Sequence, residues 1–493
     1  MKILLLNAPP LKKFGVIGQM YPPLGILYLA SYIRKYLKDI EIKVIDGYQE
    51  SYNTLLRNVK KVDPDVLGVS FTTQASTGAY KIINEIKKDN KSIKIICGGA
   101  HTTALPEEVL KKSETDMIVM GEGEVTFLEI LKSVKDKDQN RSILGTALWE
   151  DGRIKINPYR PLIRDLDTIP FPARDLLDIK KYPGYYYKKR RRDTSLISSR
   201  GCPFNCLFCS NPVWKHQKPW FRLRSPQNVV DEMEHIIKEF GVTEFFDETD
   251  EFNANRKWAE EVCDEITKRG MDISWKVQMR ADNMDDQLAE KMAKAGCWLG
   301  LFGIESGNDE TLKGINKKLT ISKVKQSLGI LKRHGIKAYA LFMAFNAWEE
   351  NGRLKFENKT DTLNTLDFAK ELIKEKKIDL MSWSLTTPYP GSKLFDIALR
   401  HKLIPQEFAG RWELWDSSAN LIMKLPGIGQ RDWIEVQNKG KRIQIRLLLT
   451  SGTINIQAIP LYVRRGLAQL NKVIFSKLSF RRISTKVNLD QGK

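Results

Sequence analysis

The sequence predicts an α/β fold class, with two α/β units in one chain and a basic, mainly helical region after them. Short β-branched strands alternate with amphipathic helices over residues 1–135, and the same alternation resumes near residue 193. Such alternation is typical of parallel sheets covered by helices. We therefore expect a doubly wound parallel sheet in residues 1–137, a linker in 138–192, a partial (β/α)6 barrel in 193–400 and a basic region in 401–493.

The composition excludes several classes of protein. Of the 493 residues, 42% are hydrophobic and 28% are charged, as in a folded chain and unlike a disordered or collagen-like one. No run of about 18 apolar residues occurs, so we expect no membrane-spanning helix. Asn7, Pro9 and Pro10 interrupt the short apolar start of the chain, which argues against a signal peptide. A cytoplasmic location is the resulting expectation.

The net charge of the chain suggests an anionic partner, and its cysteine usage suggests a metal site. The chain has 80 Lys and Arg residues against 60 Asp and Glu residues, a net charge of +20. This excess suggests an anionic partner, such as nucleic acid, a membrane surface or a phosphorylated substrate. Only six cysteines occur, and three of them fall within eight residues. In a reducing compartment such a cluster favours a metal site over a disulfide framework.

The first unit carries a candidate ligand site at one edge of its sheet. Its five expected strands are Lys2–Asn7, Glu41–Asp46, Val66–Phe71, Ile93–Cys97 and Met117–Met120. Doubly wound folds bind ligands at the carboxyl ends of their strands, where glycines let a ligand approach the backbone. Polar and glycine-rich turns follow the third, fourth and fifth strands. Each of them by itself also fits an ordinary tight turn, whereas three at the same sheet edge predict a ligand site. The candidate residues are Ser70, Thr72, Thr73, Gly98, Gly99, His101, Thr103, Gly121, Glu122 and Gly123.

Three motifs of this unit resemble a known family. Pro22-Pro23-Leu24-Gly25, Gly98-Gly99-x-His101-x-Thr103 and Gly121-Glu122-Gly123-Glu124 are similar to the cobalamin-binding domain that precedes many radical S-adenosylmethionine enzymes. The resemblance implies that the candidate residues bind cobalamin. Better-known cobalamin domains carry an Asp-x-His-x-x-Gly loop whose histidine ligates cobalt, and this sequence has none, so a cobalt face without a protein histidine is implied. His101 fits either a cofactor contact or a loop histidine bonded to nearby backbone.

The most specific signal is the segment Arg200–Cys209, in which the cysteines have C-x3-C-x2-C spacing. A fully protein-ligated [4Fe–4S] cluster takes four thiolates, so three leave one iron open to a small chelating molecule. Zinc is the alternative, with nearby His216 as a fourth ligand. The segment resembles the defining motif of the radical S-adenosylmethionine superfamily. That resemblance implies a [4Fe–4S] cluster on Cys202, Cys206 and Cys209, with S-adenosyl-L-methionine at the open iron.

About six strand–helix units are expected, the first strand directly before this loop and the others after it, and they open their site at the strand carboxyl ends. The resemblance assigns contacts with S-adenosylmethionine to Phe208 in the cysteine loop and to residues at successive strand ends. Each strand-end residue by itself also fits an ion pair at the barrel rim. The strand-end candidates are Glu248, Arg280, Gly303, Glu305 and Ser306.

Three further segments carry separate expectations. Tyr185–Arg192 is most simply a solvated basic loop, with contact to an anionic substrate or membrane as the alternative. Phe345–Gly352 replaces the Gly-x-Pro-Gly-Glu turn that follows the fifth strand in the family, and is a candidate substrate-specific loop. Val436–Leu489 lacks Asp and Glu and interleaves basic with apolar residues, which favours an amphipathic helix on an anionic membrane over a helix docked on the barrel. Few aromatic residues occur there to stack bases, so we expect no specific nucleic-acid partner.

We interpret the chain as a cobalamin-dependent radical S-adenosylmethionine enzyme. The resemblance implies a 5′-deoxyadenosyl radical that removes hydrogen from an unactivated carbon, most simply for C-methylation of a hydrophobic, lipid-like substrate, with an external electron donor of the flavodoxin or ferredoxin type. A non-methylating cyclase or oxidoreductase of the same layout is the alternative. A methylthiotransferase would need three cysteines in the first unit, which has only Cys97. A sensor without catalysis is disfavoured by the intact cysteine triad and the strand-end glutamates.

Overall fold

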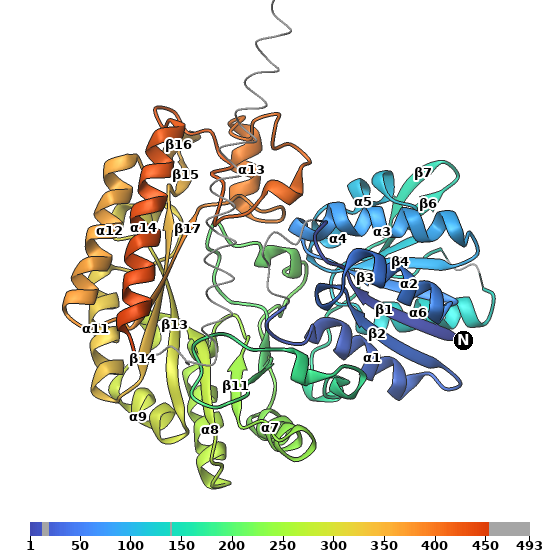
Figure 1. Ribbon diagram of the computed structural model, residues 1–493, viewed down its shortest axis with the longest axis horizontal. Coiled ribbons are helices and arrows are strands. Elements are labelled where there is room, and N and C mark those ends of the chain that lie inside the picture. The colour runs from blue at the N-terminus through green and yellow to red at the C-terminus, as the bar shows by residue number, and fades with distance from the viewer. Residues whose placement is uncertain (12–18, 139–140, 453–493) are drawn as a thin grey trace, which may run out of the picture.

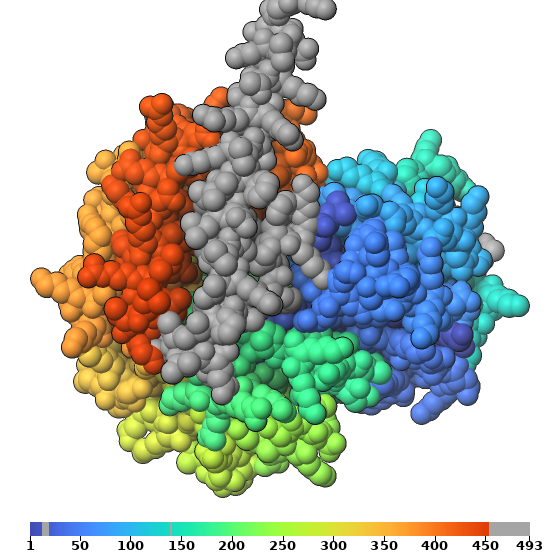
Figure 2. Space-filling model, viewed as in Figure 1, coloured from blue at the N-terminus to red at the C-terminus, as the bar shows by residue number. Residues whose placement is uncertain are grey.

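The computed structural model describes residues 1–11, 19–138 and 141–452. Two α/β units lie side by side, the first coloured blue to cyan and the second green to orange (Figure 1). Their surfaces abut where blue and green atoms meet in the space-filling view (Figure 2). The predicted α/β fold class, with an N-terminal parallel sheet and a partial barrel after it, is confirmed.

The first unit is built on a seven-stranded sheet of order β2-β1-β3-β4-β5-β6-β7. Its first five strands are parallel because helices connect them. The inner four are apolar runs buried on both faces, whereas the edge strand β2 alternates buried with exposed residues. They are β1 (Lys2–Asn7), β2 (Glu41–Asp46), β3 (Val66–Ser70), β4 (Lys94–Gly98) and β5 (Met117–Val119).

An antiparallel hairpin, β6 (Thr146–Glu150) and β7 (Arg153–Ile156), extends this sheet beyond the predicted boundary at residue 137. The first unit therefore includes residues that we had assigned to the linker.

Helices cover both faces of this sheet. On one face a core of Ile, Leu, Val and Phe side chains joins the sheet to α1 (Leu24–Tyr36) and α6 (Glu124–Lys135). The other face packs against α2 (Tyr52–Val62), α3 (Ser76–Asp89) and α5 (Pro106–Lys112). The short helix α4 (Ala100–Ala104) follows β4 directly, so the two glycines before it stand at the open edge of the sheet.

The second unit is a six-stranded parallel sheet of order β17-β14-β13-β12-β11-β8, as the partial barrel predicts. Its strands are β8 (Thr194–Leu196), β11 (Glu244–Asp247), β12 (Ser274–Met279), β13 (Cys297–Glu305), β14 (Lys337–Ala344) and β17 (Leu380–Leu385). The helices outside them are α7 (Pro226–Phe240), α8 (Arg256–Lys268), α9 (Asp286–Lys294), α10 (Asp309–Gly314), α11 (Ile321–Arg333), α12 (Lys359–Lys374) and α13 (Lys393–Arg400).

The ends of α7 illustrate why these sequences fold locally as they do. The Ser225 hydroxyl accepts a hydrogen bond from the Asn228 backbone, and Pro226 occupies the first helical position. Gly241 ends the helix with a φ of +65°, a conformation that costs glycine little.

The last helix of the described residues, α14 (Gln430–Thr450), packs on the barrel. Val436 is fully buried, and a Cβ at Gly440 would clash with the ring of the buried Trp383 on β17. The first part of the predicted membrane-binding stretch is therefore a helix docked on the barrel, and the remainder lies outside the described residues. In the described ranges we find no helix with the length and apolar content needed to cross a membrane.

The tyrosines of the predicted basic loop close the floor of the barrel instead of facing solvent. Tyr187 is 4% exposed and packs with Tyr21 and the β14 residue Tyr339 on the inner side of the sheet. Beneath them the fully buried Lys276 ammonium donates to a carboxylate oxygen of Asp193 at 2.6 Å. The expectation of a solvated loop is wrong for these residues, because their rings fill a lumen that only six strands surround.

Residues 345–356 form a hairpin above the fifth barrel strand. Its strands are β15 (Ala347–Glu350) and β16 (Arg353–Phe356), joined by Asn351 and Gly352 with φ values of +51° and +75°. Positive φ at both positions is what a tight two-residue hairpin turn demands.

Candidate functional site

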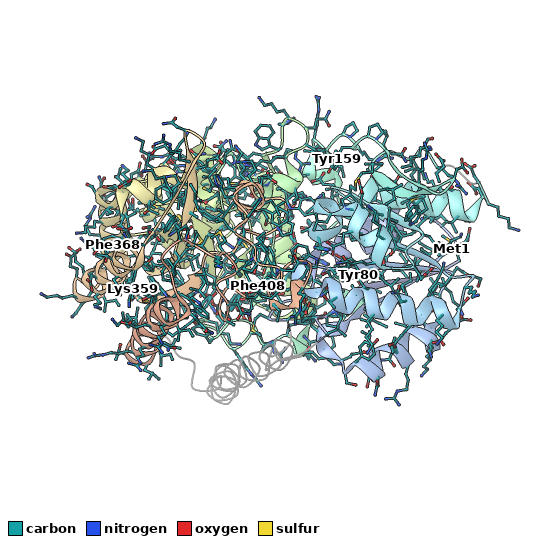
Figure 3. The ribbon with its side chains drawn as sticks, turned by 90° about the horizontal axis from the view of Figure 1, so that it is seen from above. Met1, Tyr80, Tyr159, Lys359, Phe368 and Phe408 are labelled. Atoms are coloured by element: carbon teal, nitrogen blue, oxygen red, sulfur yellow. The ribbon has the colours of Figure 1, made fainter. Side chains whose placement is uncertain are left out.

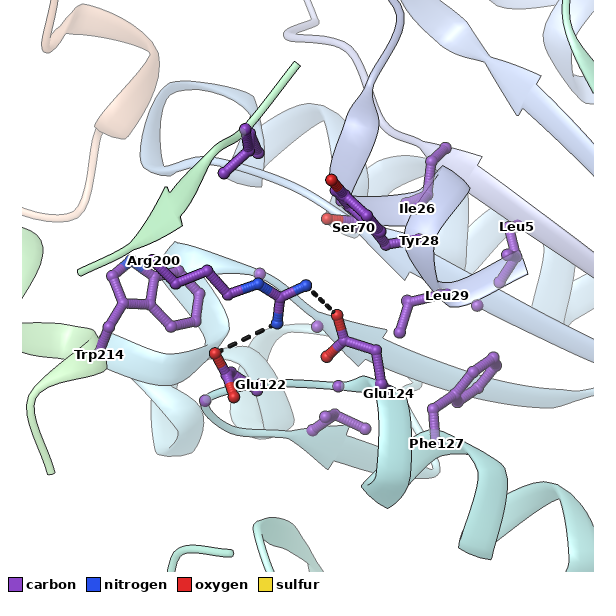
Figure 4. A pocket seen from close by; sticks show the side chains of 18 of the residues that line it. Leu5, Ile26, Tyr28, Leu29, Ser70, Glu122, Glu124, Phe127, Arg200 and Trp214 are labelled. Carbon is purple, nitrogen blue, oxygen red and sulfur yellow. Dashed lines mark hydrogen bonds and ion pairs between the residues drawn. The ribbon is translucent and has the colours of Figure 1, made fainter. Parts of the chain in front are cut away.

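A cavity of about 350 Å³ lies between the two units, at the carboxyl ends of β3, β4 and β5. Figure 4 shows it from close by. Its deep part runs between the first sheet and helices α1 and α6. The walls there are apolar and are formed by Leu5, Gly68, Ile96, Val119 and Phe127. Its other wall comes from the barrel unit and includes Arg200, Gly201 and Trp214 from the cysteine segment.

Six of the residues predicted at the first sheet edge line this cavity. They are Ser70, Gly98, Gly99, Gly121, Glu122 and Gly123. Gly99 and Gly121 have φ values of +105° and +75°, so glycine is required there to turn the chain. No histidine is among the described residues that line the cavity.

The other four residues predicted there lie behind the cavity wall and support it. The Thr103 hydroxyl donates to the Gly99 carbonyl at 2.9 Å and accepts from the Gly121 amide at 3.1 Å, so it ties the two glycine turns together. Thr72 hydrogen-bonds the hydroxyl of Tyr48.

His101 is fully buried, with Nε2 at 2.9 Å from the Tyr80 hydroxyl and Nδ1 at 3.3 Å from the hydroxyl of Thr73. Burial lowers the pKa of His101 to about 4, so the ring is neutral.

The three cysteines lie on one half-buried loop and carry no disulfide. Burial raises the pKa of Cys202 to about 12 and that of Cys209 to about 11, so a metal must displace their protons. Among the described residues no group of three His, Cys, Asp or Glu side chains converges to hold a single metal ion. His216, the alternative zinc ligand, instead stacks on Tyr159 with ring centroids 4.3 Å apart.

A charged group surrounds the open side of Cys206. Glu305 has a strained φ of +69° and pairs with the buried Lys317 ammonium at 3.1 Å. The buried Arg280 guanidinium stacks on the ring of Phe204 at 3.9 Å and donates to Asp282 at 2.8 Å.

Two polar atoms of this group, Nη1 of Arg280 and Oε2 of Glu251, have no hydrogen-bond partner among the described residues. Burial raises the pKa of Glu251 to about 7. Unsatisfied positive and negative groups of this kind fit a ligand that carries both a carboxylate and an amine.

The remaining barrel candidates occupy different surroundings. Glu248 lines the cavity, and burial raises its pKa to about 7. Gly303 stands beside the Glu305 carboxylate and the Lys317 ammonium, where a Cβ would clash. The Ser306 hydroxyl is turned away and donates to the buried Glu357 carboxylate at 2.7 Å. Phe208 packs beneath the Lys317 ammonium, with its ring centroid at 5.9 Å.

Three residues of the site, Arg200, Arg222 and Lys317, were not among the predicted site residues. Arg200 directly precedes the Gly201-Cys202 pair, so its position next to the motif was an available signal. Lys317 follows the fourth strand only after a short helix, and Arg222 lies in a polar stretch with no motif. Nothing in the sequence indicated that these two would reach the site.

Comparison with known proteins agrees with this geometry. Residues 14–131 match the model of the B12 binding domain, and residues 196–350 match that of the Radical SAM superfamily. An uncharacterized methyltransferase of Pyrococcus horikoshii is 33% identical over 82% of this chain and 84% of its own length. The chain belongs to the cobalamin-dependent radical S-adenosylmethionine family.

Other members of the family differ in reaction. The anaerobic magnesium-protoporphyrin IX monomethyl ester cyclase of Rubrivivax gelatinosus is 30% identical over 77% of this chain and 66% of its own length. The solved structure of the methyltransferase TsrM from Kitasatospora setae, with cobalamin and a [4Fe–4S] cluster bound, superposes with a TM-score of 0.64 at 18% identity, covering 82% of this chain and 78% of the other. The fold is therefore shared with an enzyme that holds both cofactors.

The residues of this chain fit the three cofactors of the family: cobalamin, a [4Fe–4S] cluster and S-adenosyl-L-methionine. The glycine-rich edge and apolar depth of the cavity suit cobalamin. Three thiols on one loop suit a cluster with an open iron, since the other cysteines, Cys97, Cys263 and Cys297, are buried elsewhere. The unsatisfied charges near Cys206 suit the amino acid end of S-adenosylmethionine.

Proposed function

We propose that this enzyme methylates an unactivated sp3 carbon of a hydrophobic, lipid-like substrate. The observation that carries the proposal is the shared cavity, because the turns that suit cobalamin and the loop that holds the cluster cysteines face each other across it. When bound, the cluster and S-adenosylmethionine supply a hydrogen-abstracting 5′-deoxyadenosyl radical, and cobalamin supplies a methyl group. Water is kept out by the apolar wall on one side and by the tyrosine floor of the barrel on the other.

In this proposal the side chains near Cys206 orient S-adenosylmethionine. Arg280 and Lys317 offer positive charge to its carboxylate, whereas Glu251 and Glu305 accept from its amine. These four groups are held by a buried rim and keep their geometry without reorganisation. Phe208 lies on the cysteine loop, whose backbone groups would contact the adenine of S-adenosylmethionine.

The inner face of the barrel supports an apolar substrate that bears a polar group. Leu341 and Met343 of β14 are half-buried and pair in register with Ser382 and Ser384 of β17. These four side chains alternate with residues that pack against the outer helices, so they face the lumen. Two apolar side chains beside two hydroxyls suit a largely hydrocarbon molecule with an alcohol or carbonyl group.

A radical cyclase or oxidoreductase is the second candidate function. It is favoured by the 30% identity to the protoporphyrin ester cyclase, an enzyme whose name describes ring closure. Both reactions would begin with the same cluster loop and the same S-adenosylmethionine contacts. They differ in whether a methyl group is transferred afterwards.

An anaerobic product analysis distinguishes the two. The reconstituted enzyme receives cobalamin, a flavodoxin and its reductase as electron donor, methyl-deuterated S-adenosylmethionine and a membrane-lipid extract. We expect 5′-deoxyadenosine, S-adenosylhomocysteine and a deuterated lipid. 5′-Deoxyadenosine together with an unlabelled, dehydrogenated or cyclised product would instead establish the second function. A variant with Cys206→Ala is the control, because it removes a cluster ligand without touching the cobalamin turns.

We further propose that the protein sits at the cytoplasmic face of an anionic membrane, where a lipid-like substrate is available. The support is the basic composition of residues 451–489, which contain no Asp or Glu. Docking of α14 itself on the barrel narrows the candidate membrane contact to residues 453–493.

A further inference from the structure

Four charged side chains meet across the boundary between the two units, inside the cavity wall. Glu122 of the first unit accepts from Arg222 at 2.6 and 2.9 Å and from Arg200 at 3.2 Å. Glu124 accepts from Arg200 at 2.5 Å. Figure 4 shows the two bonds of Arg200, which extends from the barrel unit toward both carboxylates. We call these four residues the interdomain ion network.

The two arginines are neighbours on a small antiparallel ladder that brackets the cysteine loop. Arg200 ends β9 (Ser199–Arg200) and pairs with Arg222, which begins β10 (Arg222–Leu223). The loop between them, residues 201–221, carries all three cluster cysteines. The two glutamates belong to the Gly121–Glu124 turn at the edge of the cavity. The network therefore joins the base of the cluster loop directly to a turn of the cobalamin site.

The far end of the same loop touches the same turn. A Cβ at Gly121 would lie 2.9 Å from the imidazole of His216, which follows the last cysteine by seven residues. The ring of His216 is held in place by stacking on Tyr159. The cluster loop is thus fixed against the Gly121–Glu124 turn at its base and near its end.

The burial of the network makes it stiff. The exposed fractions of its side chains are 13% for Glu122, 5% for Glu124, 19% for Arg200 and 5% for Arg222. Burial by itself would raise the pKa of Glu122. The guanidinium groups of Arg200 and Arg222 instead hold this pKa below its usual value, so the carboxylate stays charged. Removing one partner of a buried pair leaves an uncompensated charge, which is far costlier than losing an exposed pair.

A second contact between the units lies away from the cofactors. The segment after α13 crosses to the first unit, where the Trp412 indole donates to Glu108 at 2.6 Å and Thr77 donates to Glu413 at 3.1 Å. Phe408 of this segment lies near the boundary between the units in the view from above (Figure 3). Because this contact joins the units independently, the ion network is not needed merely to hold them together.

We propose that the interdomain ion network is a positioning device that sets the separation and orientation of cobalamin relative to the [4Fe–4S] cluster. Cobalamin binds between two half-sites, and the network aligns one half with the other before the cofactor arrives. When the network is broken, cobalamin must order the two half-sites as it binds, and this loss of entropy weakens its binding. Breaking the network also lets the cluster loop sample several positions relative to the cobalamin turns.

The test uses the holoprotein with its cluster, hydroxocobalamin as the titrant, and no substrate. Arg222→Gln, Glu122→Gln and the double variant are compared with wild type, with Arg222→Lys as a charge-retaining variant and Glu413→Gln as the control for the distant contact. Absorbance titration gives the Kd, and pulsed electron paramagnetic resonance of cob(II)alamin with the reduced cluster gives the distribution of cobalt–cluster distances.

We expect each Gln variant to raise the Kd about tenfold and to broaden the distance distribution, since each loses charge-assisted hydrogen bonds. The double variant should lose no more than either single one, because the partners act together. Arg222→Lys should retain a narrow distribution, and Glu413→Gln should match wild type.

Two results would overturn the inference. One is a wild-type Kd and an unbroadened distance distribution in both single Gln variants. The other is a double variant whose loss is the product of the two single losses, as independent contacts with cobalamin would give. Neither depends on which substrate is methylated. A failed lipid methylation assay would therefore refute the proposed function and leave this test intact.

Discussion

The absence of a side chain at Gly98 keeps open the cavity that we propose for cobalamin, and we expect valine at this position to fill it. Gly98 ends β4, and a Cβ there would meet only Val119 within 4 Å, at a nearest distance of 3.8 Å. That is ordinary van der Waals contact. Gly98→Val therefore places its methyl groups in the space that the cavity occupies and not in the packed core.

The effect on binding follows from the cost of overpacking. Forcing extra carbons into a fitted site costs about 1–3 kcal/mol, which weakens binding by roughly five- to 150-fold. The effect on folding has the opposite sign. Because β-branched residues suit a strand and glycine is unusually free when unfolded, we expect the free energy of unfolding to rise by about 0.5–1 kcal/mol.

Hydroxocobalamin titration and urea unfolding of the same preparation measure the two effects. Gly329→Ala is the matched control, because it lies on α11 with no other atom within 4 Å of the added methyl group. That variant should gain stability and bind cobalamin as wild type does. Wild-type affinity in Gly98→Val would refute the assignment of this cavity to cobalamin. A loss of unfolding free energy as large as the loss of binding free energy would show that the valine methyl groups enter the packed core and not the cavity.

Three further predictions follow from the structure. Cys206→Ala should abolish both cluster iron and 5′-deoxyadenosine formation, as measured by iron analysis and anaerobic turnover. Retention of iron and turnover would contradict the role of Cys206 as a cluster ligand. Because burial raises the pKa of Glu248 to about 7 from 4.5, the protonated carboxyl stabilises the apoprotein at pH 4.5, and this contribution is lost as the pH rises through 7. The free energy of unfolding, measured with urea, should therefore fall between pH 4.5 and 8, and this fall should be about 2–3 kcal/mol smaller in Glu248→Gln than in wild type. An equal fall in both proteins would count against a buried, protonated carboxyl. Deleting residues 453–493 should reduce sedimentation with anionic vesicles without shifting the Tm, since α14 is kept, and equal sedimentation would reject the membrane contact.

The strands and the cysteine loop could be predicted because their signals are local. The predicted bounds of β1, β2, β12 and β14 agree with the structure. β1 and β14 are apolar runs, whereas β2 and β12 alternate apolar with polar residues, and both patterns are local in the sequence. The spacing of Cys202, Cys206 and Cys209 likewise specifies its chemistry within eight residues. The hairpin β6–β7 was missed because half of it is exposed, which leaves a weak apolar pattern in a region that reads as linker.

Side-chain roles that depend on distant partners could not be predicted. His101 follows a cofactor-like glycine pair, yet its ring is satisfied by Tyr80 and Thr73 and packs against Trp412, a residue more than 300 positions away. The basic, apolar pattern of α14 fits a membrane surface and a barrel equally well. The buried Val436 and the packing of Gly440 on Trp383 decide between them, because a sequence pattern shows which face of a helix is apolar and not what covers that face.

The sequence by itself predicted the order of the two units, the cysteine triad that we propose as cluster ligands and the glycine turns at the first sheet edge, because each signal rests on residues close together in the chain. The tertiary structure alone decided that these turns and the cluster loop share one cavity. Glu122 and Arg222 are 100 residues apart, and no periodicity or spacing relates them. They meet because the two units bury opposite charges at a common boundary, where each charge must find a partner.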